Sequence, residues 1–130
     1  MVRGTNWVAT VCVAGLVASA GLAADGVFKA LSNSVMWADA AQWTNGVPAE
    51  GADATALLLD PGLSSYTVNL TEGDSPWLLG KLEQNAGNKT VTFQGGEYLF
   101  RGAPAVIKGN NGNRYDFRSR LTAESNLLVY

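Results

Sequence analysis

The residues best suited to bind a ligand form a basic strip near the end of the chain. In the segment RYDFRSRL, residues 114–121, every second residue is charged, and Tyr115, Phe117 and Leu121 lie at the alternate positions. In a β-strand this period of two places Arg114, Arg118 and Arg120 on one face. Guanidinium groups match the geometry of carboxylates, so the strip is a candidate site for an acidic polysaccharide. The competing interpretation is a solvated strand face whose charges discourage pairing at a sheet edge.

Acidic side chains are the remaining candidates for catalysis. The chain has no histidine, and its one cysteine, Cys12, lies in an apolar N-terminal run, which excludes Ser-His-Asp sites, Cys-His sites and the usual zinc sites. A glycosidase needs two carboxyl groups about 5 to 10 Å apart, and the candidates are Glu72, Asp74 and Glu97. Each lies next to glycine in an expected turn, so turn chemistry explains them. We therefore predict no catalytic residue, no cofactor and no enzymatic activity.

Two other sets of side chains have both a functional and a structural interpretation. Three aspartates could bind calcium: Asp39, Asp53 and Asp60. No loop has the alternating acidic spacing of an EF-hand, so we predict no metal site and expect Asp53 to accept backbone N–H groups before its strand. Three tryptophans could stack on sugar rings: Trp37, Trp43 and Trp77. In a short chain such large apolar surfaces are expected in the core.

Charge is distributed unevenly along the chain. Residues 25–100 hold nine acids and three lysines, whereas residues 101–130 hold two acids and five bases: Arg101, Lys108, Arg114, Arg118 and Arg120. The formal net charge is -2, which gives no strong attraction to nucleic acid or to anionic membranes. We therefore expect no nucleic-acid partner.

The first 24 residues have the pattern of a secretory signal peptide. Arg3 is followed by an uncharged stretch, residues 8–24, which ends in small residues suited to a signal peptidase. An uncleaved membrane anchor is the alternative, because the stretch is long enough to just span a bilayer. Export without a disulfide favours a bacterial envelope protein, secreted or on the outer cell surface. Residues 25–130 would then form one β-rich domain.

Short apolar runs separated by turn residues predict β-strands throughout this domain. The expected strands are residues 54–59, 66–70, 77–82, 90–93, 98–100 and 105–107. Gly95 and Gly96 allow two folds. As a hairpin turn they would pair residues 91 and 93 with 100 and 98 in an antiparallel sandwich, and as a corner they would join strands on adjacent faces of a β-solenoid.

The opening of the domain resembles a known family. It has a pair of tryptophans, Gly-Val-Pro at 46–48, the step GADA at 51–54 and then short strands that close in AVI at 105–107. This order is similar to the N-terminal part of bacterial autotransporter-associated β-strand repeat proteins and covers roughly residues 35–128. The resemblance implies a right-handed parallel β-helix displayed outside the cell. The family's glycine-rich repeat unit and C-terminal membrane barrel or sorting segment are absent, which predicts a truncated or minimal member.

The resulting prediction is an all-β protein, a right-handed parallel β-helix (solenoid) fragment after a signal peptide, with an antiparallel β-sandwich as the alternative. Its predicted function is a non-enzymatic surface or adhesin-like role. A carbohydrate-binding sandwich module comes second and a polysaccharide lyase fragment third. Expected partners are extracellular glycans or other surface proteins, and contact with a membrane would come only through export or a missing C-terminal anchor. The apolar run at 127–130 is expected to be an uncovered strand.

Overall fold

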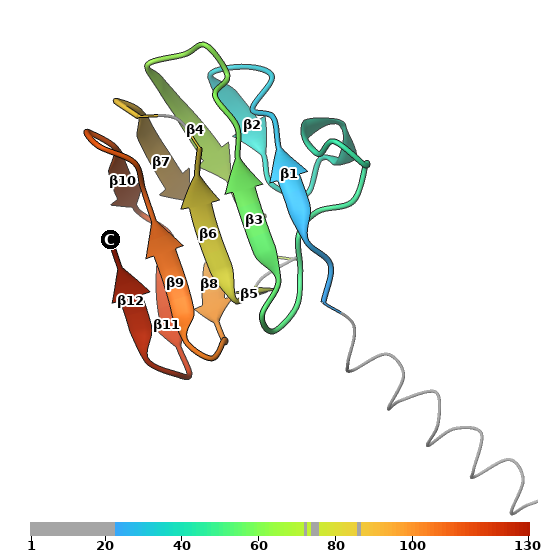
Figure 1. Cartoon of the computed structure of the whole chain (residues 1–130). Helices are drawn as coiled ribbons and strands as arrows, with labels where there is room; N and C mark the ends of the chain where they lie inside the picture. Colours follow the sequence, from blue (N-terminus) through green and yellow to red (C-terminus); the bar gives the residue numbers. More distant parts are fainter. Residues whose placement is uncertain (1–22, 72, 74–75, 86) are drawn as a thin grey trace, which may run out of the picture.

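The computed structural model in Figure 1 describes residues 23–71, 73, 76–85 and 87–130. All but the last two positions of the predicted signal peptide lie outside these residues. The described residues contain twelve short strands and one 3-10 turn, η1 (Ala40–Gln42), so the all-β prediction is confirmed. Within them, no helix has the length and apolar character needed to cross a membrane.

The strands form three sheets. The five-stranded sheet has the order β1 (Gly26–Phe28), β3 (Thr55–Leu58), β6 (Lys81–Gln84), β9 (Ala105–Lys108) and β12 (Leu127–Val129). The four-stranded sheet has the order β10 (Arg114–Phe117), β7 (Thr90–Gln94), β4 (Ser65–Asn69) and β2 (Ser34–Met36). The three-stranded sheet has the order β11 (Arg120–Ala123), β8 (Glu97–Phe100) and β5 (Trp77–Leu79). All strand pairs within these sheets are parallel.

The chain visits the three sheets in a fixed order. It passes through β3, β4 and β5, returns to the first sheet as β6 beside β3, and repeats the passage as β6–β7–β8 and β9–β10–β11 (Figure 1). We call one such passage a circuit. Side-chain hydrogen bonds between successive later circuits join residues 23 to 25 positions apart, which is the length of one circuit.

The antiparallel sandwich considered from the sequence is wrong. Gly95 and Gly96 do not form a hairpin, because β7 and β8 belong to different sheets and each pairs with strands of neighbouring circuits. Both glycines have positive φ, 73° and 45°, and form a corner. A Cβ on Gly95 would lie 2.5 Å from the carbonyl oxygen of Leu70, so the corner also packs tightly against the preceding circuit.

The apolar run predicted at residues 77–82 is also divided between two sheets. Gly80 separates β5 from β6, and a Cβ on this residue would lie 2.3 Å from the Cα atom of Asp53. Such a distance is too short for any side chain, so only glycine lets the two backbones approach here. Trp77, Leu79 and Leu82 are nevertheless all buried, as their apolar character predicts.

The core consists of columns of side chains, because parallel pairing in register places equivalent residues of successive circuits side by side. One column contains Ala56, Leu82 and Ile107, all of them buried. Another continues from Val68 through Phe93 to Phe117, whose ring stacks on that of Phe93 with the centroids 4.8 Å apart. The three sheets therefore enclose one continuous interior.

A tryptophan cluster closes the first end of this interior. Trp37 and Trp43 are 0% and 1% exposed and meet edge to face, with Phe28 against both rings. The indole Nε1 of Trp43 donates to the carbonyl oxygen of Trp37 at 2.8 Å. The segment that carries Trp43 also pairs with β1, since Lys29 N donates to Gln42 O and Thr44 N donates to Val27 O. We call residues 37–50 the cap, and its tryptophans confirm the predicted core position.

Replacing Trp37 by Ala is expected to lower the free energy of unfolding by about 3 to 5 kcal/mol, because the variant loses one of the two fully buried indole rings of the capped end and leaves a cavity. Urea denaturation followed by circular dichroism would measure the change. Leu31→Ala is the control, since Leu31 is 62% exposed and its loss should change the free energy by no more than about 0.5 kcal/mol. Equal effects of the two substitutions would show that the cap is not part of the cooperative core.

Candidate functional site

The three arginines of the predicted basic strip do not share one strand face. Arg114 begins β10, Arg120 begins β11, and these strands belong to different sheets. Arg118 lies in the corner between them, where its guanidinium pairs with the carboxylate of Asp116 at 3.2 Å. All three side chains are exposed, but they extend outward around a corner of the molecule. The prediction of a single strand over residues 114–121 is therefore wrong, and a flat basic strip is not formed.

Residues 114–121 do not form a single strand because backbone hydrogen bonds hold a corner between β10 and β11. The N–H groups of Arg118 and Ser119 both donate to the carbonyl oxygen of Phe93, at 2.7 and 3.0 Å. The side chain of Ser119 is buried, so it continues the inward series of Phe117 while the chain changes sheets. Alternation of inward and outward residues is preserved through the corner, and the sequence pattern is the same as that of one straight strand.

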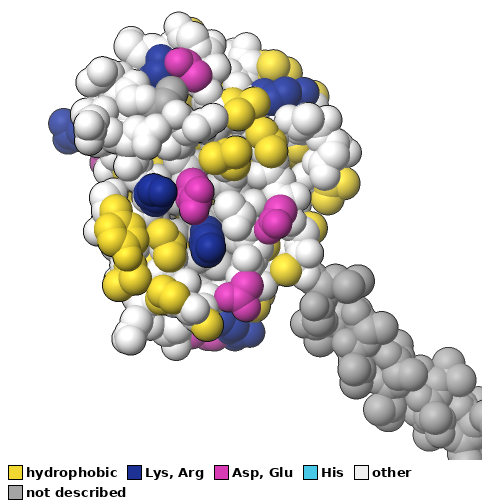
Figure 2. Space-filling model, viewed as in Figure 1, with side chains coloured by type: hydrophobic (Ala, Val, Ile, Leu, Met, Phe, Trp, Pro, Cys, Tyr) yellow, Lys and Arg dark blue, Asp and Glu magenta, His cyan; other side chains and the backbone are white. Residues whose placement is uncertain are grey.

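The outer face of the five-stranded sheet carries mixed charges. Pairing in register places Leu57 beside Glu83 and Glu83 beside Lys108, and a second row places Lys81 beside Val106. Figure 2 shows this face with basic and acidic side chains next to one another and hydrophobic groups on either side. Such a surface offers no extended field of one sign to a polyanion.

The aspartates considered as calcium ligands each have a separate structural role. Asp39 caps η1 by accepting from Ala41 N at 3.0 Å, and its pKa is lowered by hydrogen bonds from the Gln42 side chain and from Ala41 N–H. Asp53 accepts from Ala103 N at 3.1 Å, so it bonds a backbone N–H as predicted, but the donor is 50 residues further along the chain and not in the turn before β3. Among the described residues no three Asp, Glu, His or Cys side chains come together as a metal site.

Of the three carboxylates considered for catalysis, only Glu97 lies within the described residues. Glu72 and Asp74 lie outside the described residues. Glu97 starts β8 and accepts a hydrogen bond from the hydroxyl of Thr122, one circuit further on. This bond ties β8 to β11 and gives Glu97 a structural role in the stack.

Aromatic side chains are used mainly inside the protein. Trp77 is 8% exposed, and the other two candidate sugar-stacking tryptophans are fully buried, so the three do not form a platform for sugar rings. Burial raises the pKa of the Tyr98 phenol well above its ordinary value, and the pKa values of Tyr66 and Tyr115 are raised for the same reason. These phenols stay protonated at physiological pH and cannot act there as bases.

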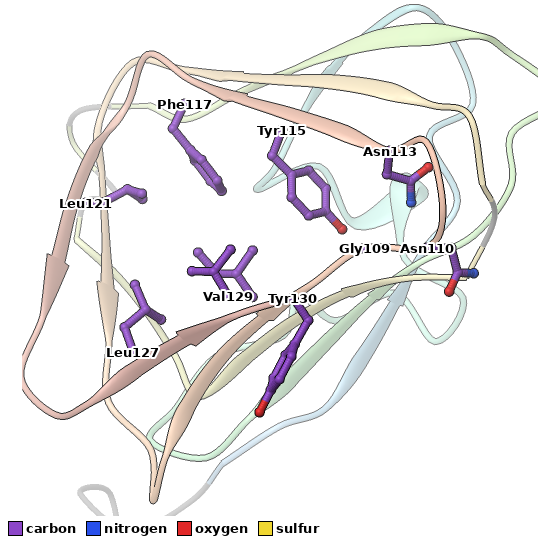
Figure 3. Close-up of a pocket in the computed structure, with 10 residues that line it drawn as sticks. Gly109, Asn110, Asn113, Tyr115, Phe117, Leu121, Leu127, Val129 and Tyr130 are labelled. Carbon is purple, nitrogen blue, oxygen red and sulfur yellow. The ribbon is translucent and has the colours of Figure 1, made fainter.

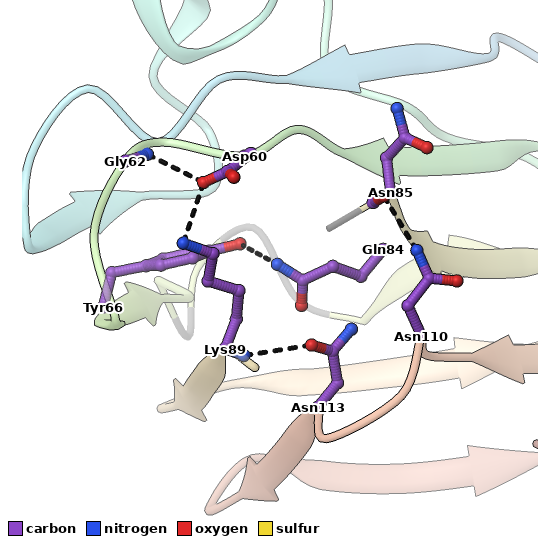
Figure 4. Close-up of polar contacts among 8 residues, drawn as sticks. All are labelled: Asp60, Gly62, Tyr66, Gln84, Asn85, Lys89, Asn110 and Asn113. Carbon is purple, nitrogen blue, oxygen red and sulfur yellow. Dashed lines mark hydrogen bonds and ion pairs between the residues drawn. The ribbon is translucent and has the colours of Figure 1, made fainter. Parts of the chain in front are cut away.

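A polar network joins three circuits at another corner of the molecule (Figure 4). Lys89 Nζ lies 2.9 Å from Asp60 Oδ1, and the same carboxylate accepts from Gly62 N at 2.8 Å. The backbone of Lys89 donates to the Asn113 side chain at 3.0 Å, and Asn110 Nδ2 donates to Asn85 O at 2.8 Å. The expected tight turn at 110–113 is present, with Gly112 at φ 76°. The contacts of Lys89 and Asn110 join successive circuits, and the bond from Gly62 N stabilises a turn, which identifies the network as structural.

The sequence pattern did not reveal a cavity at the last circuit. It has a volume of about 350 Å³ and an apolar lining formed mainly by Tyr115, Phe117, Leu121, Leu127 and Val129. In Figure 3 side chains from β10, β11 and β12 point toward one another around it. The apolar run at 127–130 was the available signal, and its predicted exposure is confirmed, since Val129 and Tyr130 are 68% and 71% exposed. The cavity can hold apolar groups.

Comparisons of this chain with protein-family models, with curated proteins and with solved structures find no match.

The ion pair of Asp60 should make stability depend on pH in the acidic range. The hydrogen bond from Lys89, followed by that from Gly62 N–H, lowers the pKa of Asp60 below its ordinary value of about 3.9. A pKa lowered by folding means that the carboxylate stabilises the fold above the unfolded-state value and that this contribution is lost as pH falls through the folded-state value. The free energy of unfolding of Asp60→Asn should therefore fall less steeply below about pH 4 than that of the wild type.

Urea denaturation at a series of pH values would measure this slope. The difference should be small and should shrink in high salt, because the Asp60 side chain is exposed to solvent. Lys89→Met is the matched variant, since it removes the main cause of the lowered pKa and should flatten the slope in the same way. Identical slopes in all three proteins would contradict the assigned role of the pair.

Proposed function

We propose that this chain is a non-enzymatic secreted or cell-surface protein of a bacterial envelope, in which residues 25–130 form a right-handed parallel β-helix that acts as a scaffold or contact surface. The observation that carries the proposal is the repeated passage through three parallel sheets, with side-chain bonds at intervals of one circuit. A stack of circuits presents long, rigid outer faces, which suits display and contact better than enclosure of a substrate.

Two further observations support this proposal. The N-terminal pattern of a cation, an apolar stretch and small residues is typical of export. The described carboxylates considered for chemistry are engaged in caps, turns and links between circuits. The adhesin-like role and the family resemblance are parts of the same proposal and depend on the sequence pattern.

Export predicts a mature protein that begins between Gly21 and Asp25, because the small-residue cleavage sites lie just before it. Intact-mass measurement of the protein from the envelope fraction of an expressing bacterium would locate its first residue. The control is a double variant in which Ala20 and Ala23 are both replaced by Leu. The bulky side chains should block cleavage by signal peptidase. Protein that retains Met1 in wild-type cells would contradict removal of a signal peptide.

The surface proposal also predicts no hydrolase or lyase turnover and only weak, salt-sensitive binding of acidic glycans. Arg114, Arg118 and Arg120 point away from a corner, so few of them can contact one ligand at a time, and their charges are screened over about 8 Å at physiological ionic strength. A glycan array followed by calorimetry should show acidic binding that is lost in the triple Arg→Gln variant. Micromolar binding of a neutral glycan that survives in this variant would favour a carbohydrate-binding module.

A further inference from the structure

A second cavity lies on the outer side of the five-stranded sheet, beside the cap. It has a volume of about 420 Å³ and is formed mainly by Asp25, Val27, Thr44, Asn45, Thr55 and Leu57. These residues belong to β1, β3, the positions just before β1, and the cap. We call this cavity the outer groove, and the last circuit of the stack contributes nothing to it.

Asp25 supplies the one charged group of the outer groove. Its Oδ1 accepts a hydrogen bond from Thr55 N at 2.7 Å, which holds the carboxylate at the start of β3. Among the described residues no ion pair engages this carboxylate. The preceding residue, Ala24, exchanges backbone hydrogen bonds of 2.8 and 3.0 Å with Glu50, so its N–H group is directed at the cap. The negative charge of Asp25 therefore has no basic partner.

The neighbouring strand does not cancel this charge. Parallel register places Lys81 of β6 beside Thr55 and Glu83 beside Leu57, so β6 contributes one charge of each sign. No lysine or arginine of the described residues lines the outer groove. Residues 25–100 as a whole hold nine acids and three lysines. The electrostatic field at the outer groove therefore favours a cation over an anion.

The lining combines an aliphatic surface with oxygen acceptors. Val27 and Leu57 are half-buried and offer a surface on which an alkyl chain can lie, as the stems of lysine side chains lie on apolar surfaces. Asp25, Thr44 and Thr55 contribute oxygen atoms, and an ammonium group has three donors and no acceptor. The lining has no aromatic ring on which a sugar could stack. An ammonium group on an aliphatic chain matches both parts of this lining.

We propose that the outer groove binds a primary alkylammonium group, carried by a small free amine or by a lysine side chain. The ammonium would bond to the second oxygen of Asp25 and to the hydroxyl oxygen of Thr55, and the alkyl chain would lie over Val27 and Leu57. The affinity should be modest and should fall with added salt, because Asp25 is exposed to solvent. This site goes beyond the proposed scaffold role and does not depend on it.

Amide NMR spectra of the purified protein at low ionic strength would test the proposal, with pentylamine as the probe. Pentylamine should shift the signals of residues 25–27, 44–45 and 55–57 in a saturable way. It should bind at least fivefold more tightly than n-pentanol, which has the same alkyl length and no charge. Lysine capped with acetyl and methylamide groups distinguishes the two sources. It should bind more tightly than pentylamine if the site recognises lysine in a polypeptide, and more weakly if it recognises a free amine.

Three variants test the assigned charges. Asp25→Asn should lower the affinity for pentylamine at least fivefold, and the new amide oxygen can still accept from Thr55 N. Lys81→Gln should raise the affinity about twofold, because it removes a neighbouring cation. Asp116→Asn is the matched control, since it removes the same charge from β10, in another sheet, and should bind as the wild type does. Circular dichroism would verify that each variant is folded.

Three results would overturn the proposal. The first is the lack of saturable shifts at the outer groove with pentylamine. The second is equal affinity for pentylamine and pentanol, which would mean that the groove does not recognise charge. The third is saturation of the same signals by glucose at a lower concentration than by pentylamine, which would assign the outer groove to a neutral sugar.

Discussion

Parallel backbone pairing in register is the constraint on which the rest of this structure depends. Each inner strand of a sheet bonds to the strand one circuit earlier and to the strand one circuit later, so equivalent residues must lie beside one another. The side chains of one column therefore share one environment, either the apolar interior or the solvent-facing side. Apolar columns fill the interior, and outside it Gln94 Nε2 donates to Asn69 Oδ1 at 2.7 Å. Side-chain amide groups at paired positions of neighbouring strands are close enough to hydrogen-bond to one another. Such bonds stabilise the observed strand register relative to a shifted register.

Strand positions could be predicted from the sequence because burial alternates within each strand. Tyr66, Val68 and Leu70 were expected on one face and are all buried. Corners could be predicted less well. Phe117, Ser119 and Leu121 keep the inward period across a change of sheet, so the sequence shows no interruption there. The candidate arginines were therefore identified by residue type but were assigned the wrong arrangement.

Strand partners could not be predicted, because they depend on residues one circuit away. A hairpin and a corner both need positive φ at Gly95 and Gly96, and local sequence does not distinguish them. The close approach of Gly95 to the carbonyl group of Leu70 belongs to the corner and has no counterpart in the sequence pattern. The cavity at the last circuit was missed for the same reason, since strands of three different sheets contribute to its lining.

The difference between the capped and the open end gives the stack a direction. β1 is bonded on both sides, by β3 and by the cap, whereas β12 has one strand neighbour, β9, among the described residues. Circuits that contact only their neighbours can open one after another, so amide hydrogen exchange should be fastest at β12 and slow down toward the cap. A chain made from its N-terminus completes the capped end first. The cap can then act as the template on which each later circuit folds.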